Sequence, residues 1–248
     1  MKTSKPTLPS SSDNQAKRVK SSIRAHIPQS WLALTNEQRH YLCALMAGGE
    51  WTADEVKALF LARIIGQSHR VLLQLKDDIA ELMPLVDFIG QPPAEPSRMS
   101  HIAGHAAVDA MLDGVPFRTY LEVENYYQGY LKVQSPDALD AIGMALYPGT
   151  TAADFDNAHR VMLLMWLVGL KAQYAGLFPH LFGAPGSADP DSAPPDPRAV
   201  MITCLRALTG GDITKQPAVL STPTLDALTE LDAKAEESEK LKSFSFHS

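Results

Sequence analysis

The sequence predicts an all-α protein: an irregular helical bundle with a long buried central helix, a disordered N-terminal leader and linker-tethered C-terminal helices. Three observations lead to this fold class. The block from Val161 to Leu170 carries no charged side chain, although Arg160 and Lys171 flank it. Apolar residues recur at helical spacing along most of the chain, and several such stretches begin with capping residues. Crossing a bilayer takes about 20 apolar residues, so the block indicates a core helix and no membrane span.

Composition limits the class of protein before any motif is considered. The chain has 248 residues, 45% of them hydrophobic, which is enough to bury a sizeable core and excludes disorder throughout. Cys43 and Cys204 lie in apolar helical patterns, so they form neither a disulfide framework nor a zinc-type cysteine spacing. The lysines near the start precede no apolar stretch, which argues against a secretory signal peptide and predicts a cytoplasmic protein.

Charge is divided unevenly along the chain. The net charge is -6, yet residues 1–25 contain six lysines and arginines against the single acid Asp13. We expect residues 1–27 to be a disordered, solvated leader, although a basic arm could also contact nucleic acid or an acidic partner. The remainder is acidic and would be repelled by a phosphate backbone, so nucleic-acid binding is not expected.

The first two helices are predicted by their capping boxes. Thr35 and Gln38 can each satisfy the other's unpaired backbone N–H at the start of a helix over residues 36–47. Thr52 and Glu55 repeat this pattern, and a second apolar helix follows them. Two glycines between the helices favour a left-handed helix end, so the pair should form an αα-hairpin.

Hydrophobic spacing and prolines place the remaining helices. Residues 71–75 suit a short strand or a helix start, and residues 100–114 are ambiguous because Gly104 and Gly114 weaken an otherwise helical pattern. Pro84 should kink or divide its helix. The helices expected after the hairpin cover residues 77–89, 116–133, 135–147, 152–178, 197–209 and 223–241.

Proline content divides the chain into parts. Residues 183–197 hold five prolines and three aspartates, the strongest linker signal in the sequence. We therefore expect the leader over 1–27, a main helical domain over 28–182, this linker, and a C-terminal helical pair over 198–242.

The last predicted helix carries a leucine stripe. Leu225, Leu228 and Leu231 recur at helical spacing above an acidic face. Such a stripe either packs back on the body of the protein or is offered to a partner helix, and the proline-rich linker is compatible with both.

His101, His105 and Asp109 are candidate metal ligands. Their four-residue spacing would place two imidazoles and a carboxylate on one side of a helix. The pattern lacks a glutamate beside the first histidine, which a zincin helix needs as its general base. We therefore expect a surface or loop-capping role, with no metal and no cofactor, and a metal-dependent enzyme on these residues is the third functional hypothesis.

The segment from Tyr120 to Tyr130 is the densest polar and aromatic patch of the sequence. Glu124 shares a helix face with Tyr120 and Tyr127, so a buried Glu124 could have a raised pKa and act as an acid or base. A glutamate hydrogen-bonded to tyrosine hydroxyls in a helical core is the commoner arrangement. Because neither a nucleophile with a base nor a glycine-rich phosphate loop accompanies this patch, we expect a non-enzymatic protein.

The first hairpin supports a rival hypothesis. Leu34 and Thr35, an apolar helix, a glycine stop and a second capped helix resemble the start of the helix-turn-helix domains of LuxR-type and sigma-factor-type regulators. This resemblance implies DNA binding through residues 34–76. The segment expected to hold the recognition helix contains Asp77, Asp78 and Glu81, which would face phosphates unfavourably, so a DNA-binding regulator is the alternative function.

A second resemblance covers more of the chain. It rests on Leu205–Lys215 and Ala227–Glu236, with further similarity at Glu124–Tyr130 and Phe178–Phe182. These strings resemble all-helical proteins of phage-derived and mobile-element clusters, which are loosely similar to phage tail-assembly chaperones. The resemblance extends over most of residues 30–240 and carries over no functional residue. It implies an assembly or adaptor protein that binds a larger helical protein through helix-mediated contacts.

Overall fold

The computed structural model describes residues 26–66, 81–182 and 197–245. Almost all of the leader expected over 1–27, the segment 71–75 and almost all of the linker expected over 183–197 lie outside these ranges.

The all-α fold class is confirmed. The α-helices are α1 (Asn36–Gly48), α2 (Ala53–Ile64), α5 (Phe117–Val133), α6 (Pro136–Leu146), α7 (Asn157–Leu177), α8 (Pro179–Phe182), α9 (Pro197–Thr209), α10 (Gln216–Ser221) and α11 (Thr224–Ser245). Short 3-10 helices are η1 (Met83–Gly90), η2 (Ala152–Asp154) and η3 (Ile213–Lys215). In the described ranges the strands are β1 (His101–Ile102) and β2 (His105–Ala106), which pair antiparallel.

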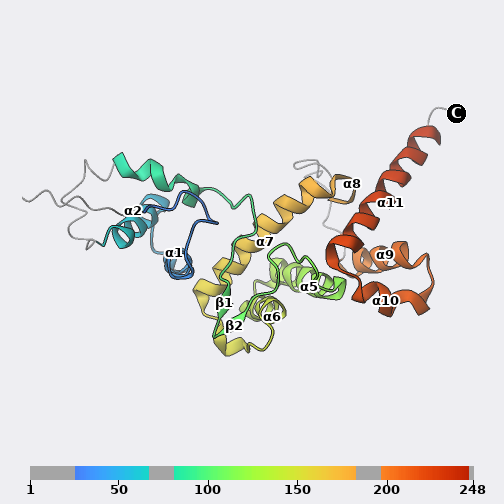
Figure 1. Cartoon of the computed structure of the whole chain (residues 1–248), viewed down its shortest axis with the longest axis horizontal. Coiled ribbons are helices and arrows are strands. Elements are labelled where there is room, and N and C mark those ends of the chain that lie inside the picture. The colour runs from blue at the N-terminus through green and yellow to red at the C-terminus, as the bar shows by residue number, and fades with distance from the viewer. Residues whose placement is uncertain (1–25, 67–80, 183–196, 246–248) are drawn as a thin grey trace, which may run out of the picture.

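The predicted central helix is α7, which runs through the middle of the molecule with α1 and α2 toward one end and α9, α10 and α11 at the other (Figure 1). It begins later than expected, because residues 152–154 form the separate turn η2. The indole of Trp166 is fully buried and donates to the carbonyl of Ala110 at 2.9 Å. No helix among the described residues has the length and apolar character needed to cross a membrane.

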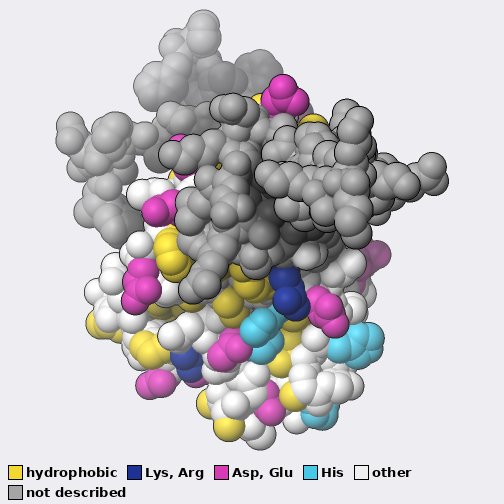
Figure 2. Space-filling model, turned by 90° about the vertical axis from the view of Figure 1, so that its left-hand side faces the viewer, with side chains coloured by type: hydrophobic (Ala, Val, Ile, Leu, Met, Phe, Trp, Pro, Cys, Tyr) yellow, Lys and Arg dark blue, Asp and Glu magenta, His cyan; other side chains and the backbone are white. Residues whose placement is uncertain are grey.

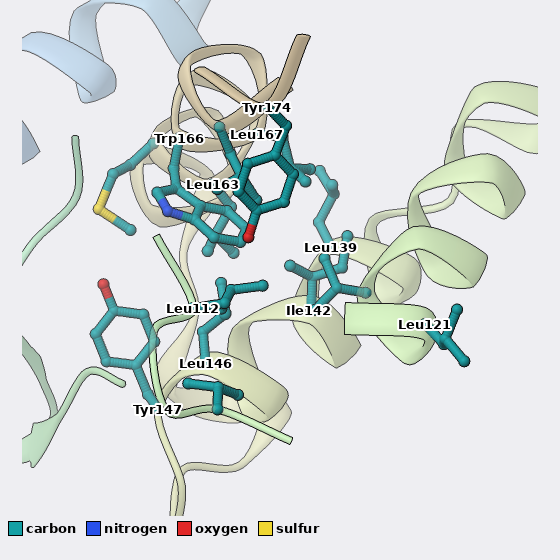
Figure 3. Close-up of a cluster of buried hydrophobic side chains, with 14 of the residues drawn as sticks. Leu112, Leu121, Leu139, Ile142, Leu146, Tyr147, Leu163, Trp166, Leu167 and Tyr174 are labelled. Carbon is teal, nitrogen blue, oxygen red and sulfur yellow. The ribbon is translucent and has the colours of Figure 1, made fainter. Parts of the chain in front are cut away.

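The main hydrophobic core lies where α5, α6 and α7 meet, together with the loop that precedes α5 (Figure 3). Two tyrosines of this core bury their hydroxyls by donating to backbone carbonyls: Tyr147 to Met99 at 2.7 Å and Tyr174 to Met111 at 2.6 Å. These bonds fix the loop against the helices, since an unpaired hydroxyl would be costly there. Other fully buried members are Leu112, Phe117, Ile142, Leu146, Met162 and Leu163.

A close approach of two backbone segments holds α7 against the loop before β1. A Cβ atom added at Gly169 would lie 2.3 Å from the carbonyl oxygen of Glu95 and 2.8 Å from the nitrogen of Pro96. Next to this contact, the side-chain amide of Gln173 donates to the carbonyl of Ala94 at 2.9 Å. Only glycine fits at position 169 without displacing the loop.

A second, smaller core joins α1, α2 and η1. Both predicted capping boxes are present at the starts of α1 and α2, so this hairpin is confirmed. The buried guanidinium of Arg39 donates to the carbonyls of Trp31, Leu34 and Arg98, which ties α1 to the segments on either side. Met165 of α7 packs against this second core, so α7 contacts both cores. The buried members are Trp31, Leu34, Leu42, Val56, Phe60, Leu61, Val86 and Ile89.

The C-terminal helices complete the main core. Leu228 and Leu231 are 1% and 4% exposed and belong to the same hydrophobic cluster as Trp166, and Leu225 packs against that cluster. Of the two alternatives for the leucine stripe, the structure therefore has the one in which it packs back on the body. The side chain and the N–H of Thr224 both donate to the carbonyl of Val115 at 2.8 Å, which ties the start of α11 to the start of α5.

Candidate functional site

The outward side of α5 forms one edge of a long hollow, which we call the α5 groove. It consists of two adjoining hollows of about 460 and 670 Å³ that share Asn125 and Arg198. α5 supplies one side of the groove, α9 and α10 supply the other, and the start of α6 lies at one end. The residues contributed by α5 are Arg118, Leu121, Glu122, Asn125, Tyr126, Gly129, Lys132 and Val133.

Helical spacing explains why these side chains share one side. Arg118, Glu122, Asn125, Gly129 and Lys132 follow one another at three- or four-residue intervals, so they fall on a single face of α5. A Cβ atom added at Gly129 would meet no other atom within 4 Å, so the groove is open at this position in the described structure. The groove therefore has no side chain on α5 at this position, which lies in the C-terminal third of the helix.

Apolar and charged groups alternate along the groove. The apolar lining comes from Met201 and Leu220, which are half-buried against the main core, and from Leu121, which is only 8% exposed. Val133 at the end of α5 is 73% exposed. Arginine and lysine outnumber carboxylates among the lining residues: Arg118, Lys132 and Arg198 against Glu122 and Asp137. The lining therefore combines apolar side chains with charged groups of both signs.

The predicted polar and aromatic patch is divided between two places: Tyr120, Val123 and Glu124 line a cavity of about 220 Å³ between α5 and α7, and Asn125, Tyr126 and Gly129 line the α5 groove. Glu124 there accepts from Lys171 at 2.7 Å and from the amide of Gln128 at 2.8 Å. The expected bonds between Glu124 and tyrosine hydroxyls are absent from the described contacts. The ammonium of Lys171 also lies 5.0 Å from the ring centre of Tyr127, as a cation–π contact.

Electrostatics make this cavity a poor acid–base site. Burial, with the negative charge of Glu124 nearby, raises the pKa of Tyr120 well above its ordinary value, so Tyr120 stays protonated. Glu124 is half-buried and has a lysine and an amide as partners, which satisfies both of its oxygens. The cluster is best explained as a structural link between α5 and α7.

His101, His105 and Asp109 do not lie on a helix. His101 and His105 are on the β1–β2 hairpin, whose turn residues Ala103 and Gly104 have positive φ angles of 49° and 83°. Two-residue turns with positive φ at both positions connect the strands of tight hairpins, and glycine adopts positive φ without steric cost. The helical spacing that would align the three side chains is therefore absent, and in the described ranges they do not form a metal-ligand group.

Asp109 has the loop-capping role that was the expected alternative to metal binding. Its Oδ1 accepts from the N–H of Met111 at 2.8 Å and from the N–H of Asp113 at 3.0 Å. These bonds organise the loop that leads into α5.

A different cluster of potential metal ligands is present at the junction of α1 and α7. The Nε2 atom of His40 lies 2.8 Å from one oxygen of Asp156, and the Nδ1 atom of His159 lies 2.8 Å from the other. One ligand atom from each residue lies within 4.8 Å of the other two. Sequence spacing does not reveal this cluster, because His40 lies 116 positions from Asp156 and only the Asp156–His159 spacing is local.

Hydrogen bonds set the charge state of this cluster. Burial tends to raise the pKa of Asp156, but the hydrogen bonds with the N–H of His159 and with the ring of His40 outweigh it and hold the pKa below its ordinary value. Burial lowers the pKa of His159 despite the neighbouring carboxylate, which favours a neutral imidazole. The cluster therefore combines an ionised carboxylate with a neutral ring.

The helix-turn-helix alternative remains a prediction. α1 and α2 form the expected hairpin, but Phe60 and Leu61 of α2 are buried in the second core. Asp77 and Asp78 of the expected recognition segment lie outside the described residues.

Comparison with known proteins gives no match: no family model fits the chain, and neither a curated protein nor a solved structure is significantly similar to it.

Proposed function

We propose that the chain is a non-enzymatic assembly or adaptor protein that binds a helix of a larger protein in the α5 groove. The single observation that carries this proposal is the groove itself, which follows α5 for most of its length and is open at Gly129, near the C-terminal end of the helix.

The dimensions of the groove suit a helix as the bound element. α5 has 17 residues, which corresponds to a length of about 25 Å at ~1.5 Å per residue. A partner helix of four to five turns, or about 25 Å, could lie along it. Helices pack at interaxial distances of about 8–10 Å, and a glycine permits approaches at the short end of this range. Gly129 is placed where such an approach would occur.

Chemistry defines the kind of helix that would bind. Leu121, Met201 and Leu220 favour an apolar stripe on the partner, and the unbranched side chain of Met201 can adapt to its shape. The resemblance of Leu205–Lys215 and Ala227–Glu236 to proteins similar to phage tail-assembly chaperones supports a structural protein of a phage-like particle as the partner.

A substitution at the open position tests the proposal. Gly129→Trp would fill the groove without meeting other atoms at its Cβ, whereas Gly176→Trp introduces the same side chain at an open position of α7 outside the groove. We expect a larger helical protein to co-purify from the source cells with the original chain and with Gly176→Trp. Gly129→Trp should reduce its recovery at least about tenfold, which corresponds to ~1.4 kcal/mol of binding free energy.

Two results would refute this assignment. If the three forms of the chain enrich the same proteins equally, the partner does not occupy the groove. If no protein is enriched over a tag-only control, the adaptor function itself fails. Circular dichroism must show equal helix content for all three forms, so that a folding defect is not mistaken for lost binding.

A further inference from the structure

We propose that His40, Asp156 and His159 form a binding site for a borderline divalent metal ion of the zinc class. This site lies at the α1–α7 junction, and it is independent of the α5 groove and of any partner that the groove binds. Figure 2 shows the end of the molecule that carries α1, where exposed histidine and acidic side chains lie among one another.

The carboxylate of Asp156 is the centre of the site. Its Oδ2 lies 2.8 Å from Nε2 of His40 and its Oδ1 lies 2.8 Å from Nδ1 of His159. The two imidazoles therefore approach the carboxylate through their nitrogen atoms, and their ring centres are 4.9 Å apart. Three ligand atoms of suitable type converge on one small region.

Local structure holds two of the three ligands in place. Asp156 is the N-cap of α7 and accepts from the backbone N–H of His159 at 2.9 Å. Its own N–H donates to Nδ1 of His159 at 3.2 Å, a hydrogen bond that a metal ion bound at Nδ1 would replace. The His159 side chain is 15% exposed, and its ring meets the ring of Phe155 edge-on at 6.2 Å. This pair is preorganised, which reduces the cost of assembling a site.

The third ligand, His40, lies on α1, which is held against α7. α1 packs along α7, and Asn36 at the start of α1 exchanges hydrogen bonds with Ser100, whose hydroxyl and N–H lie 2.9 and 3.1 Å from the Asn36 amide. His40 lies one turn further along α1, and its side chain is 39% exposed, so its ring can rotate to adjust a bond to a metal.

The donor set matches the chemistry of zinc. Two imidazole nitrogens with one carboxylate oxygen are the ligands of catalytic zinc sites that keep a fourth position for water. Bonds of about 2.0–2.2 Å in a tetrahedral site place ligand atoms roughly 3.3–3.5 Å apart. Whichever oxygen of Asp156 binds the ion, its 2.8 Å contact with the imidazole must open by about 0.5–0.7 Å, which the exposed ring of His40 and the carboxylate can accommodate.

Calcium and magnesium are poorer candidates. Both prefer sites built mainly from oxygen atoms, and this cluster offers oxygen from a single carboxylate. Imidazole ligands instead favour zinc, copper, nickel and iron. Zinc is the ion to test first, with cobalt as its spectroscopic substitute.

The site offers variants that preserve the helix cap. Gln is the usual partner at the third position of a capping box, so His159→Gln removes the ring but keeps the bond to the cap. Asn is as good an N-cap as Asp, so Asp156→Asn removes the charge and keeps the cap. His40→Gln alters only a partly exposed side chain of α1. His180→Gln, in α8 beyond the far end of α7, is the matched control.

The experiment is a calorimetric titration of the full chain, freed of any affinity tag and of bound metal, with zinc chloride. We expect saturable binding of one ion per chain. Loss of a direct ligand should weaken binding at least about 100-fold in His40→Gln, His159→Gln and Asp156→Asn, since even outer partners of metal ligands contribute 10–100-fold. His180→Gln should bind as the original chain does.

Cobalt absorption and thermal melting provide the second readout. A cobalt complex of the original chain should show the visible bands of a low-coordinate ion, and these bands should disappear in His159→Gln. Zinc should raise the melting temperature of the original chain, and chelator should reverse the rise. The proposal is overturned if the original chain binds no zinc, or if the three ligand variants bind it as tightly as His180→Gln. Neither result bears on binding in the α5 groove.

Discussion

Replacing Gly169 by alanine should destabilise the protein, although the same change usually stabilises a helix. The added Cβ would lie 2.3 Å from the carbonyl oxygen of Glu95, whereas real Cβ contacts are essentially never shorter than 3.0 Å. The loop must move away by several tenths of an ångström. Such overpacking costs about 1–3 kcal/mol. The shift also strains the bond from Gln173 to the carbonyl of Ala94, which contributes roughly 1 kcal/mol.

The opposing term is helix propensity. Alanine is better than glycine inside a helix by about 1 kcal/mol, so the net loss of unfolding free energy should be about 2 kcal/mol. Gly176→Ala is the matched control, because a Cβ at Gly176 of the same helix meets nothing within 4 Å. This variant should gain about 0.5–1 kcal/mol.

Guanidinium unfolding followed by circular dichroism measures both changes. The midpoint for Gly169→Ala should fall and that for Gly176→Ala should rise, with equal slopes, so that the two variants differ by about 3 kcal/mol. If Gly169→Ala is as stable as Gly176→Ala, then α7 does not approach the loop as closely as described, and the argument for its fixed position is wrong.

Two further predictions concern buried ionisable groups. Both oxygens of Asp140, whose side chain is 6% exposed, accept hydrogen bonds from Arg160 at 2.8 Å. Asp140→Ala should therefore lower the free energy of unfolding in urea by about 2–3 kcal/mol, and a loss under ~0.5 kcal/mol would contradict this pairing. Burial raises the pKa of Cys43 from 9.0 to about 12, so the unfolded thiol ionises first. The contribution of the neutral Cys43 thiol to the free energy of unfolding is therefore complete below pH 9.0 and decreases toward pH 12. The difference in unfolding free energy between the original chain and Cys43→Ala should shrink over that range, and a constant difference would refute this reasoning.

Local signals in the sequence predicted the helices well. The capping boxes at Thr35 and Thr52 depend on residues three positions apart, so the sequence contains the whole interaction. The structure of residues 100–114 is harder to predict from the sequence. Their apolar spacing suits a helix, whereas the turn at Ala103 and Gly104 depends on positive φ angles. A hairpin with strands of two residues leaves almost no alternating pattern to detect.

The sites could be predicted only in part, because they depend on contacts between distant segments. The expected partner of Glu124 is a tyrosine hydroxyl, but the carboxylate instead accepts a hydrogen bond from Lys171 of α7. A charged donor gives a stronger hydrogen bond to a carboxylate than a hydroxyl does. The α5 groove depends on where α9 and α10 settle, which no periodicity specifies. His40 could not be linked to Asp156 before the packing of α1 on α7 was known.

The bond between Thr224 and Val115 joins residues 109 positions apart and has a consequence for biosynthesis. A ribosome releases the chain from its N-terminus, so the apolar surfaces of α5 and α7 emerge well before α11, whose leucines cover them. During that interval the nascent chain exposes an unfinished core. Closure of the core must therefore wait until α11 has been synthesised.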